Sequence, residues 1–124
     1  MGYRSQVVLA VGKQVLPQFL VTMAKCPEAR AMCFSHVDRM IKDYDDDGAM
    51  CFFWDGVKWY DSYECIQAIE AFMDWCEAEV IGEGTDATDA SYFFRFVRTG
   101  EDNDDNVVRG YGYDDIYISR EIQF

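Results

Sequence analysis

The sequence lacks most of the features from which an enzymatic or membrane function would be inferred. It contains a single histidine, His36, and it has no Gly-rich phosphate loop, no G-x-S-x-G motif and no cysteine–histidine pairing that would suggest an activated nucleophile. No apolar run approaches the roughly 18 to 20 residues that span a bilayer. The sequence therefore predicts a protein that is not an enzyme, binds no cofactor and does not enter a membrane.

The cysteines show no pairing pattern either. There are five, an odd number, and no two of them form a C-x-x-C pair. Each lies in an apolar stretch or at the edge of an expected helix, which is typical of free thiols in a reducing compartment. The apolar run at Gln6–Val11 is too short for the core of a signal peptide. Together with the length of 124 residues, these features predict one intracellular, cytoplasmic domain over residues 1–124.

Positive charge is scarce in most of the chain. The net charge is −12, but residues 1–42 contain six Lys/Arg and two Asp/Glu, whereas residues 43–124 contain five and twenty-one. Residues 59–94 contain nine carboxylates and neither Lys nor Arg. A field of this sign disfavours direct contact with nucleic acid or with an anionic membrane. It leaves three interpretations open: a basic protein partner, a bound cation, or solubility alone.

The hydrophobic pattern predicts three helices. The first begins near Lys13, the second is expected at Glu28–Lys42, and the third at Tyr63–Glu79 with Ser62 as its N-cap. Each carries apolar residues on one face; in the first these are Val15, Leu16, Phe19, Leu20 and Met23, and in the third Cys65, Ile66, Ile69, Phe72, Met73 and Cys76.

The strands are predicted from β-branched and aromatic runs between turn residues. Gln6–Val11 is apolar on both faces and should lie in the middle of a sheet. Asp55-Gly56 suggests a two-residue hairpin turn, and Gly82–Asp89 and Gly100–Asn106 suggest loops. The fold class that follows is α+β: a two-layer sandwich, with a mostly antiparallel sheet of about five or six strands and two or three helices on one face. Besides Gln6–Val11, the expected strands are Ala49–Trp54, Val57–Tyr60, Ser91–Thr99, Val107–Tyr113 and Ile116–Phe124.

One acidic turn has the beginning of a calcium-binding loop. Asp43, Asp45, Asp47 and Gly48 fit D-x-D-x-D-G, in which oxygen ligands alternate and the glycine makes a sharp turn. The last ligand position of such a loop holds Trp54 where a glutamate is required. A Ca²⁺ site is therefore the alternative hypothesis, and Asp side chains that cap backbone groups of a tight turn are the competing explanation.

The carboxylates also permit imitation of a polyanion. A compact protein can resemble duplex DNA only by exposing many carboxylates on adjoining surfaces, and it would then bind the Lys/Arg groove of a nucleic-acid-handling protein. The competing interpretations are a purely solubilising surface and a structural homo-oligomer, such as a homodimer formed through exposed aromatics or the final strand. The predicted partner-binding residues lie on the third helix and in acidic turns: Asp45, Asp46, Glu64, Glu70, Asp74, Glu77, Asp102, Asp104 and Asp105.

Two segments carry a resemblance to known proteins. Met1–Val7 reads MGYRSQV, and Phe94–Gly112 contains FVRTGEDNDDNVVRGYG. Both resemble a group of small tailed-bacteriophage proteins that begin Met-Gly-Tyr-Arg-Ser and carry a C-terminal Gly-Glu-Asp acidic hairpin. The resemblance implies a phage protein that acts in the cytoplasm of the host bacterium, and it transfers no catalytic residue. Because small acidic accessory proteins of phages often inhibit host defence, it also suggests an inhibitor of the anti-CRISPR or anti-restriction type, whose partner is a basic nucleic-acid-binding host protein or complex.

Overall fold

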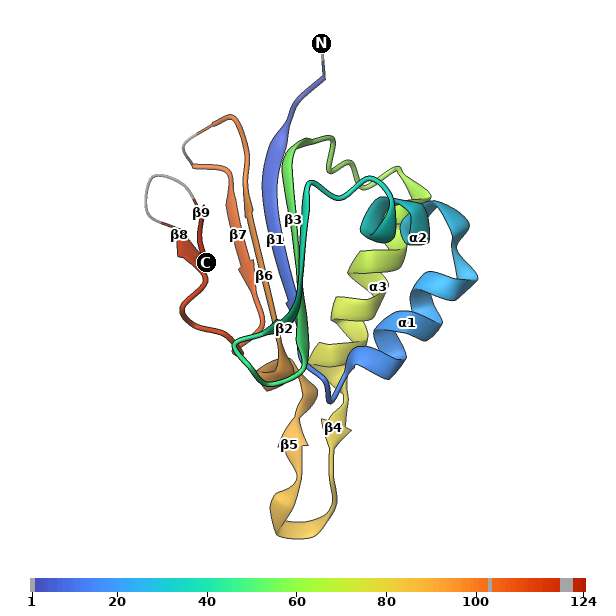
Figure 1. Cartoon of the computed structure of the whole chain (residues 1–124), viewed down its shortest axis with the longest axis vertical. Helices are drawn as coiled ribbons and strands as arrows, with labels where there is room; N and C mark the ends of the chain where they lie inside the picture. Colours follow the sequence, from blue (N-terminus) through green and yellow to red (C-terminus); the bar gives the residue numbers. More distant parts are fainter. Residues whose placement is uncertain (1, 103, 119–121) are drawn as a thin grey trace.

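A five-stranded antiparallel sheet forms the centre of the molecule (Figure 1). The computed structural model describes residues 2–102, 104–118 and 122–124. The strand order is β2-β3-β1-β6-β7, so the N-terminal strand lies in the middle, as its apolar faces predict. The strands are β1 (Ser5–Val11), β2 (Arg39–Tyr44), β3 (Ala49–Val57), β6 (Phe94–Thr99) and β7 (Asn106–Arg109).

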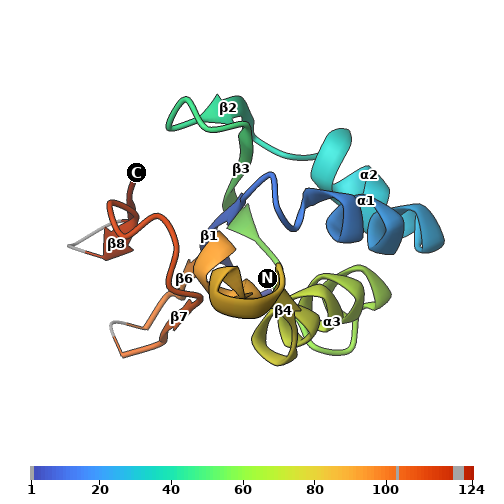
Figure 2. The same ribbon diagram turned by 90° about the horizontal axis from the view of Figure 1, so that it is seen from below.

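Three helices cover one face of this sheet, which confirms the predicted α+β class (Figure 2). They are α1 (Leu16–Lys25), α2 (Pro27–Phe34) and α3 (Glu64–Ala78). The stripe predicted on α3 is buried from Ile66 to Cys76, whereas Leu20 on α1 is 44% exposed. Aromatic side chains of the helices and the sheet meet in the core between them; Phe19 contacts Phe52 and Phe72 at ring-centroid distances of 5.4 and 5.1 Å.

The opposite face of the sheet has a smaller core. Val8 and Ala10 of β1 point to this side, where the C-terminal segment covers them with Ile116 and Ile122. That segment forms a separate two-stranded ribbon, β8 (Tyr117–Ile118) with β9 (Ile122–Gln123). The single strand expected at Ile116–Phe124 is therefore wrong where it can be checked, and residues 119–121 lie outside the described residues.

The helix predicted at Glu28–Lys42 is also wrong in its second half. The helix ends at Phe34, and Arg39–Tyr44 pairs with β3 as the edge strand of the sheet. Met40 and Ile41 continue the helical spacing of α2, but in the folded chain they lie opposite Phe52 and Cys51. Backbone pairing with β3 provides hydrogen-bond partners for every second peptide group of this segment. A short apolar run alone does not distinguish a strand from a helix.

The Asp55-Gly56 pair makes a bulge and not the predicted hairpin turn. β3 continues through both residues to Val57, so Val57–Tyr60 does not form a returning strand. Val57 lies opposite Ser5 and Asp55 opposite Gln6, which leaves Gly56 as the extra residue, with φ of 74°. The hairpin turn is instead the acidic turn between β2 and β3, where Asp43, Asp45 and Asp46 have positive φ.

Four short elements connect α3 to β6. The loop predicted at Gly82–Asp89 follows β4 (Val80–Ile81) and includes a 3₁₀ turn, η1 (Gly84–Asp86), and β5 (Thr88–Asp89), which pairs with β4 as a two-stranded ribbon. A second 3₁₀ turn, η2 (Ala90–Phe93), shortens the strand predicted to begin at Ser91. The N-cap of α3 is Tyr63, so Ser62 does not cap it. Within the described residues, none of the helices has the length and apolar character to cross a bilayer.

Candidate functional site

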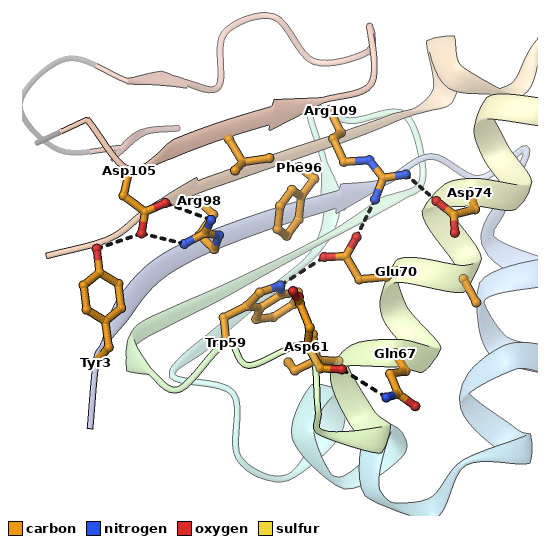
Figure 3. A pocket seen from close by; sticks show the side chains of 13 residues that line it. Tyr3, Trp59, Asp61, Gln67, Glu70, Asp74, Phe96, Arg98, Asp105 and Arg109 are labelled. Atoms are coloured by element: carbon orange, nitrogen blue, oxygen red, sulfur yellow. Dashed lines mark hydrogen bonds and ion pairs between the residues drawn. The ribbon is translucent and has the colours of Figure 1, made fainter. Parts of the chain in front are cut away.

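A cavity of about 610 Å³ opens between α3 and the β6–β7 edge of the sheet (Figure 3). Its apolar wall includes Trp59 and Phe96, whose ring centroids lie 5.3 Å apart. The indole nitrogen of Trp59 donates to Glu70 at 3.2 Å, which fixes the orientation of the ring. A cavity of this size, with an aromatic wall and several convergent polar groups, has the properties of a ligand site.

Arg109 closes the cavity on the side of β7. Its guanidinium donates to Glu70, to Asp74 at 2.8 Å and to Glu77, so all three of its nitrogens bind carboxylates of α3. Burial alone would lower the pKa of Arg109, but hydrogen bonds and charges from Glu77, Asp74 and Glu70 raise it above its ordinary value. Residues three and four apart lie on one helix face, and this face of α3 is directed at the edge strand.

A second ion pair lies at the other end of the cavity. Both terminal nitrogens of Arg98 donate to Asp105, at 3.1 and 3.0 Å, and the Tyr3 hydroxyl donates to the same carboxylate at 2.7 Å. Hydrogen bonds from Arg98 and Tyr3 lower the pKa of Asp105. Tyr3 also accepts the backbone N–H of Asp102, so the N-terminal segment holds the β6–β7 turn in place.

The most concentrated negative charge lies at the lower end of the sheet in Figure 1, where the β2–β3 turn meets the segment between β7 and β8. We call this region the acidic end; its residues, Asp45, Asp46, Asp47, Asp114 and Asp115, are all exposed. The charge of Asp115, with smaller contributions from burial and the neighbouring aspartates, raises the pKa of Asp45. This shift indicates uncompensated repulsion between the two turns.

Two exposed tyrosines stand beside the acidic end. Tyr92 shares a surface hollow with Asp45, Asp47 and Asp114. Its ring contacts that of Tyr111, and the two ring centroids are 5.3 Å apart. The exposed fractions of Tyr92 and Tyr111 are 53% and 69%. Aromatic side chains next to charge are typical of protein–protein contacts.

Two aspartates of the predicted calcium-binding loop accept backbone N–H groups of their own turn instead. Asp43 accepts the Gly48 backbone N–H at 2.7 Å, and Asp47 accepts the N–H of Ala49 and the hydroxyl of Tyr113. A strand, and not a helix, precedes the turn. No group of three or more His, Cys, Asp or Glu side chains in the described part of the chain is arranged to hold a metal ion.

The structure divides the nine predicted partner-binding residues among four places. Asp45 and Asp46 belong to the acidic end. The β6–β7 turn with Asp102, Asp104 and Asp105 lies at the opposite end of the sheet. The end of β6 pairs there with the start of β1, whereas the end of β1 pairs with the start of β3, beside the β2–β3 turn. Glu64 lies in the exposed first turn of α3. The remaining three, Glu70, Asp74 and Glu77, surround Arg109, so this group of carboxylates on α3 is paired with a cation.

Sequence reasoning missed the groups that neutralise these carboxylates. Arg109 is 39 residues from Glu70 in the sequence, and Trp59 precedes α3. No helical spacing rule therefore connects either side chain to Glu70. The available signal was the rarity of cations: Arg95, Arg98 and Arg109 are three of only five Lys/Arg after residue 42. Such isolated cations in an acidic chain are good candidates for internal ion pairs.

The thiols and the histidine add no reactive centre to the cavity. All five cysteines are free, and burial raises the pKa of Cys33, Cys51 and Cys76 to about 12. Thiols with such values are poor nucleophiles. His36 is exposed in the segment that follows α2.

Searches against protein-family models, curated proteins and solved structures found no match to this chain.

Proposed function

We propose that this protein inhibits a basic, nucleic-acid-handling protein by covering its binding groove with an acidic surface. One observation carries the proposal: every described Asp and Glu except Glu70 and Asp105 is exposed, whereas the described arginines after residue 42 are half-buried. Arg95 is half-buried and donates to two backbone carbonyls at 3.1 Å, and Arg98 and Arg109 bind carboxylates. Among the described residues, ion pairs engage only Glu70, Asp74, Glu77 and Asp105, so the other described carboxylates, all exposed, are not paired with an arginine or lysine.

The dimensions suit a short length of nucleic acid. The seven residues of β1 span roughly 23 Å at about 3.3 Å per residue. A duplex of that length carries about 14 phosphates. Carboxylates occupy both ends of this span. Five of the predicted residues are exposed and form no ion pair with an arginine of the described chain: Asp45, Asp46, Glu64, Asp102 and Asp104.

The acidic end is the part of this surface best suited to a specific contact. It combines five carboxylates with Tyr92 and Tyr111, whose rings are exposed and in tilted contact with each other. Charge supplies fast, salt-sensitive association, and aromatic rings supply the apolar contact area that charge alone lacks. The resemblance to small phage proteins supports a target in host defence, an inhibitor of the anti-CRISPR or anti-restriction type, and action in the bacterial cytoplasm.

The test is capture of a bacterial target by the tagged protein, followed by competition with duplex DNA. We expect a nucleic-acid-binding protein that is retained at low salt, released at high salt and displaced by DNA. The variant Asp45→Asn, Asp46→Asn, Asp114→Asn removes three charges from the acidic end, and asparagine tolerates the positive φ of the first two positions. It should retain at least tenfold less target.

A matched control removes three charges elsewhere. Glu79→Gln, Glu83→Gln and Asp86→Asn lie at or near the β4–β5 ribbon and are equally exposed. This control should retain target within about twofold of wild type, because exposed substitutions away from a binding site have small effects. Equal retention by the acidic-end variant and the wild type would refute the proposal, and so would a bound target that duplex DNA does not displace.

A further inference from the structure

We propose that the cavity between α3 and the β6–β7 edge is an anchor pocket for an arginine side chain of the basic partner. The inference rests on the proposed function and assigns one specific contact to it. The cavity of about 610 Å³ has room for an arginine together with the backbone that carries it. α3 forms one side of the cavity, and Asp61 lies beside Trp59 and Gln67, near the start of that helix (Figure 3).

The charges of the cavity select a cation. Its lining includes two arginines and four carboxylates, Asp61, Glu70, Asp74 and Asp105. Arg98 and Arg109 would suggest an anion site, but the terminal nitrogens of Arg98 are bound to Asp105, and every guanidinium nitrogen of Arg109 donates to a carboxylate of α3. An entering phosphate would therefore meet net negative charge, and of the guanidinium nitrogens of these two arginines only Nε of Arg98 has no carboxylate partner.

Two carboxylates of the lining retain acceptor capacity. The carboxylate of Asp61 has no partner among the described residues, since only its backbone carbonyl is bonded, to Gln67 at 3.0 Å. Asp74 uses one oxygen for Arg109, and its side chain is 73% exposed. A guanidinium has five N–H donors in a planar fork and pairs with carboxylates better than an ammonium does.

The inner wall suits the stem of the same side chain. Trp59, Phe96 and Val107 line the cavity, and the ring of Trp59 is held by its bond to Glu70. The methylene stem of an arginine packs on such apolar surface, and its guanidinium stacks on an indole face. An apolar ligand would bury the carboxylates without partners, and an anion would be repelled, so an arginine suits both the apolar wall and the carboxylates of the lining.

The experiment is a titration of the ¹⁵N-labelled full chain with the peptide Ac-Gly-Arg-Gly-NH₂, followed by the indole N–H signal of Trp59. The neutral isostere Ac-Gly-citrulline-Gly-NH₂ is the control ligand. We expect the arginine peptide to shift this signal and the citrulline peptide to leave it in place. Asp61→Asn should weaken binding of the arginine peptide about threefold, the usual size for one exposed ion pair. Equal binding of the two peptides would overturn the proposal.

A cavity-filling variant separates the pocket from general charge. Ala71 lines the cavity from the exposed side of α3, so Ala71→Phe fills it without changing any charge. Ala78→Phe adds the same ring at an exposed position at the end of α3, outside the lining. Both variants should unfold at urea concentrations close to wild type. Ala71→Phe should abolish the indole shift, and Ala78→Phe should preserve it.

Capture of the bacterial target distinguishes this inference from the proposed function. Ala71→Phe should retain several-fold less target than Ala78→Phe. Salt-sensitive, DNA-displaceable capture that is equal in the two variants would overturn the anchor pocket and leave the acidic-surface function standing. A pocket that binds the arginine peptide in a protein that captures no DNA-displaceable target would refute the proposed function, and the pocket would then belong to a free guanidinium compound and not to a partner side chain.

Discussion

Replacing Arg109 by glutamine should lower the free energy of unfolding more than the removal of any other single surface charge. Arg109 is the only cation that contacts the three carboxylates of α3 among the described ion pairs, and only 17% of its side chain is exposed. Without it, Glu70, Asp74 and Glu77 repel one another along one helix face, and Glu70 loses its charged partner in a half-buried position. The edge strand β7 also loses its bond to the helix layer.

The exposed fractions of the three carboxylates determine how much free energy of unfolding the substitution should cost. Glu70 is 33% exposed, so its charge-assisted hydrogen bond to Arg109 is worth roughly 1.5–3 kcal/mol. Glu77 and Asp74 are 45% and 73% exposed, and pairs of that kind contribute about 0.2–1 kcal/mol each. The expected loss in free energy of unfolding is therefore about 3 kcal/mol. With a urea slope of about 1.5 kcal/mol/M, the unfolding midpoint should fall by about 2 M.

Urea unfolding of single and double variants measures this loss in the free energy of unfolding and how it is divided among the carboxylates of α3. Arg30→Gln, at an exposed position on α2, is the control and should change stability by less than about 0.5 kcal/mol. In double-mutant cycles, the coupling of Arg109 to Glu70 should exceed its coupling to Asp74 by at least about 1 kcal/mol. A loss below about 1 kcal/mol for Arg109→Gln, or equal coupling to Glu70 and Asp74, would refute the burial-based reasoning.

Three other outcomes are expected. Because the pKa of Asp105 is lowered below its ordinary value of 3.8, its stabilisation is present above that pH and disappears as the pH falls through the folded value; the difference in melting temperature between wild type and Asp105→Asn should be constant above about pH 5 and close in acid. In the native protein a thiol reagent should react first with Cys26, which is half-buried. Cys33, Cys51 and Cys76 are buried and should react only after unfolding. Millimolar Ca²⁺ should leave the melting temperature unchanged, because Asp43 and Asp47 already bond the backbone of their turn; a clear rise would restore the calcium hypothesis.

The sequence by itself determined the elements whose pattern is long or buried on two sides. The run Gln6–Val11 is apolar at every position except its first, and only the middle of a sheet covered on both faces buries such a strand. The stripe from Ile66 to Cys76 repeats over several turns, so α3 and its buried face were predictable. The exposure of most carboxylates followed from their desolvation cost.

Tertiary contacts decided the segments with weak or double local preference. Arg39–Tyr44 is a strand because it pairs with β3 along most of its length, although its apolar spacing continues α2. Asp55-Gly56 is a bulge because β1 pairs along all of β3, and this long-range pairing outweighs the local turn preference of two residues.

The candidate site depended still more on tertiary structure. Its charge balance is set by Arg98 and Arg109, whose partners lie 7 and more than 30 residues away in the sequence. The helical spacing places Glu70, Asp74 and Glu77 on one face, but it does not say whether that face meets water or a guanidinium. Only the position of β7 beside α3 answers this, because Coulomb energy depends on distance and burial in space and not on separation along the chain.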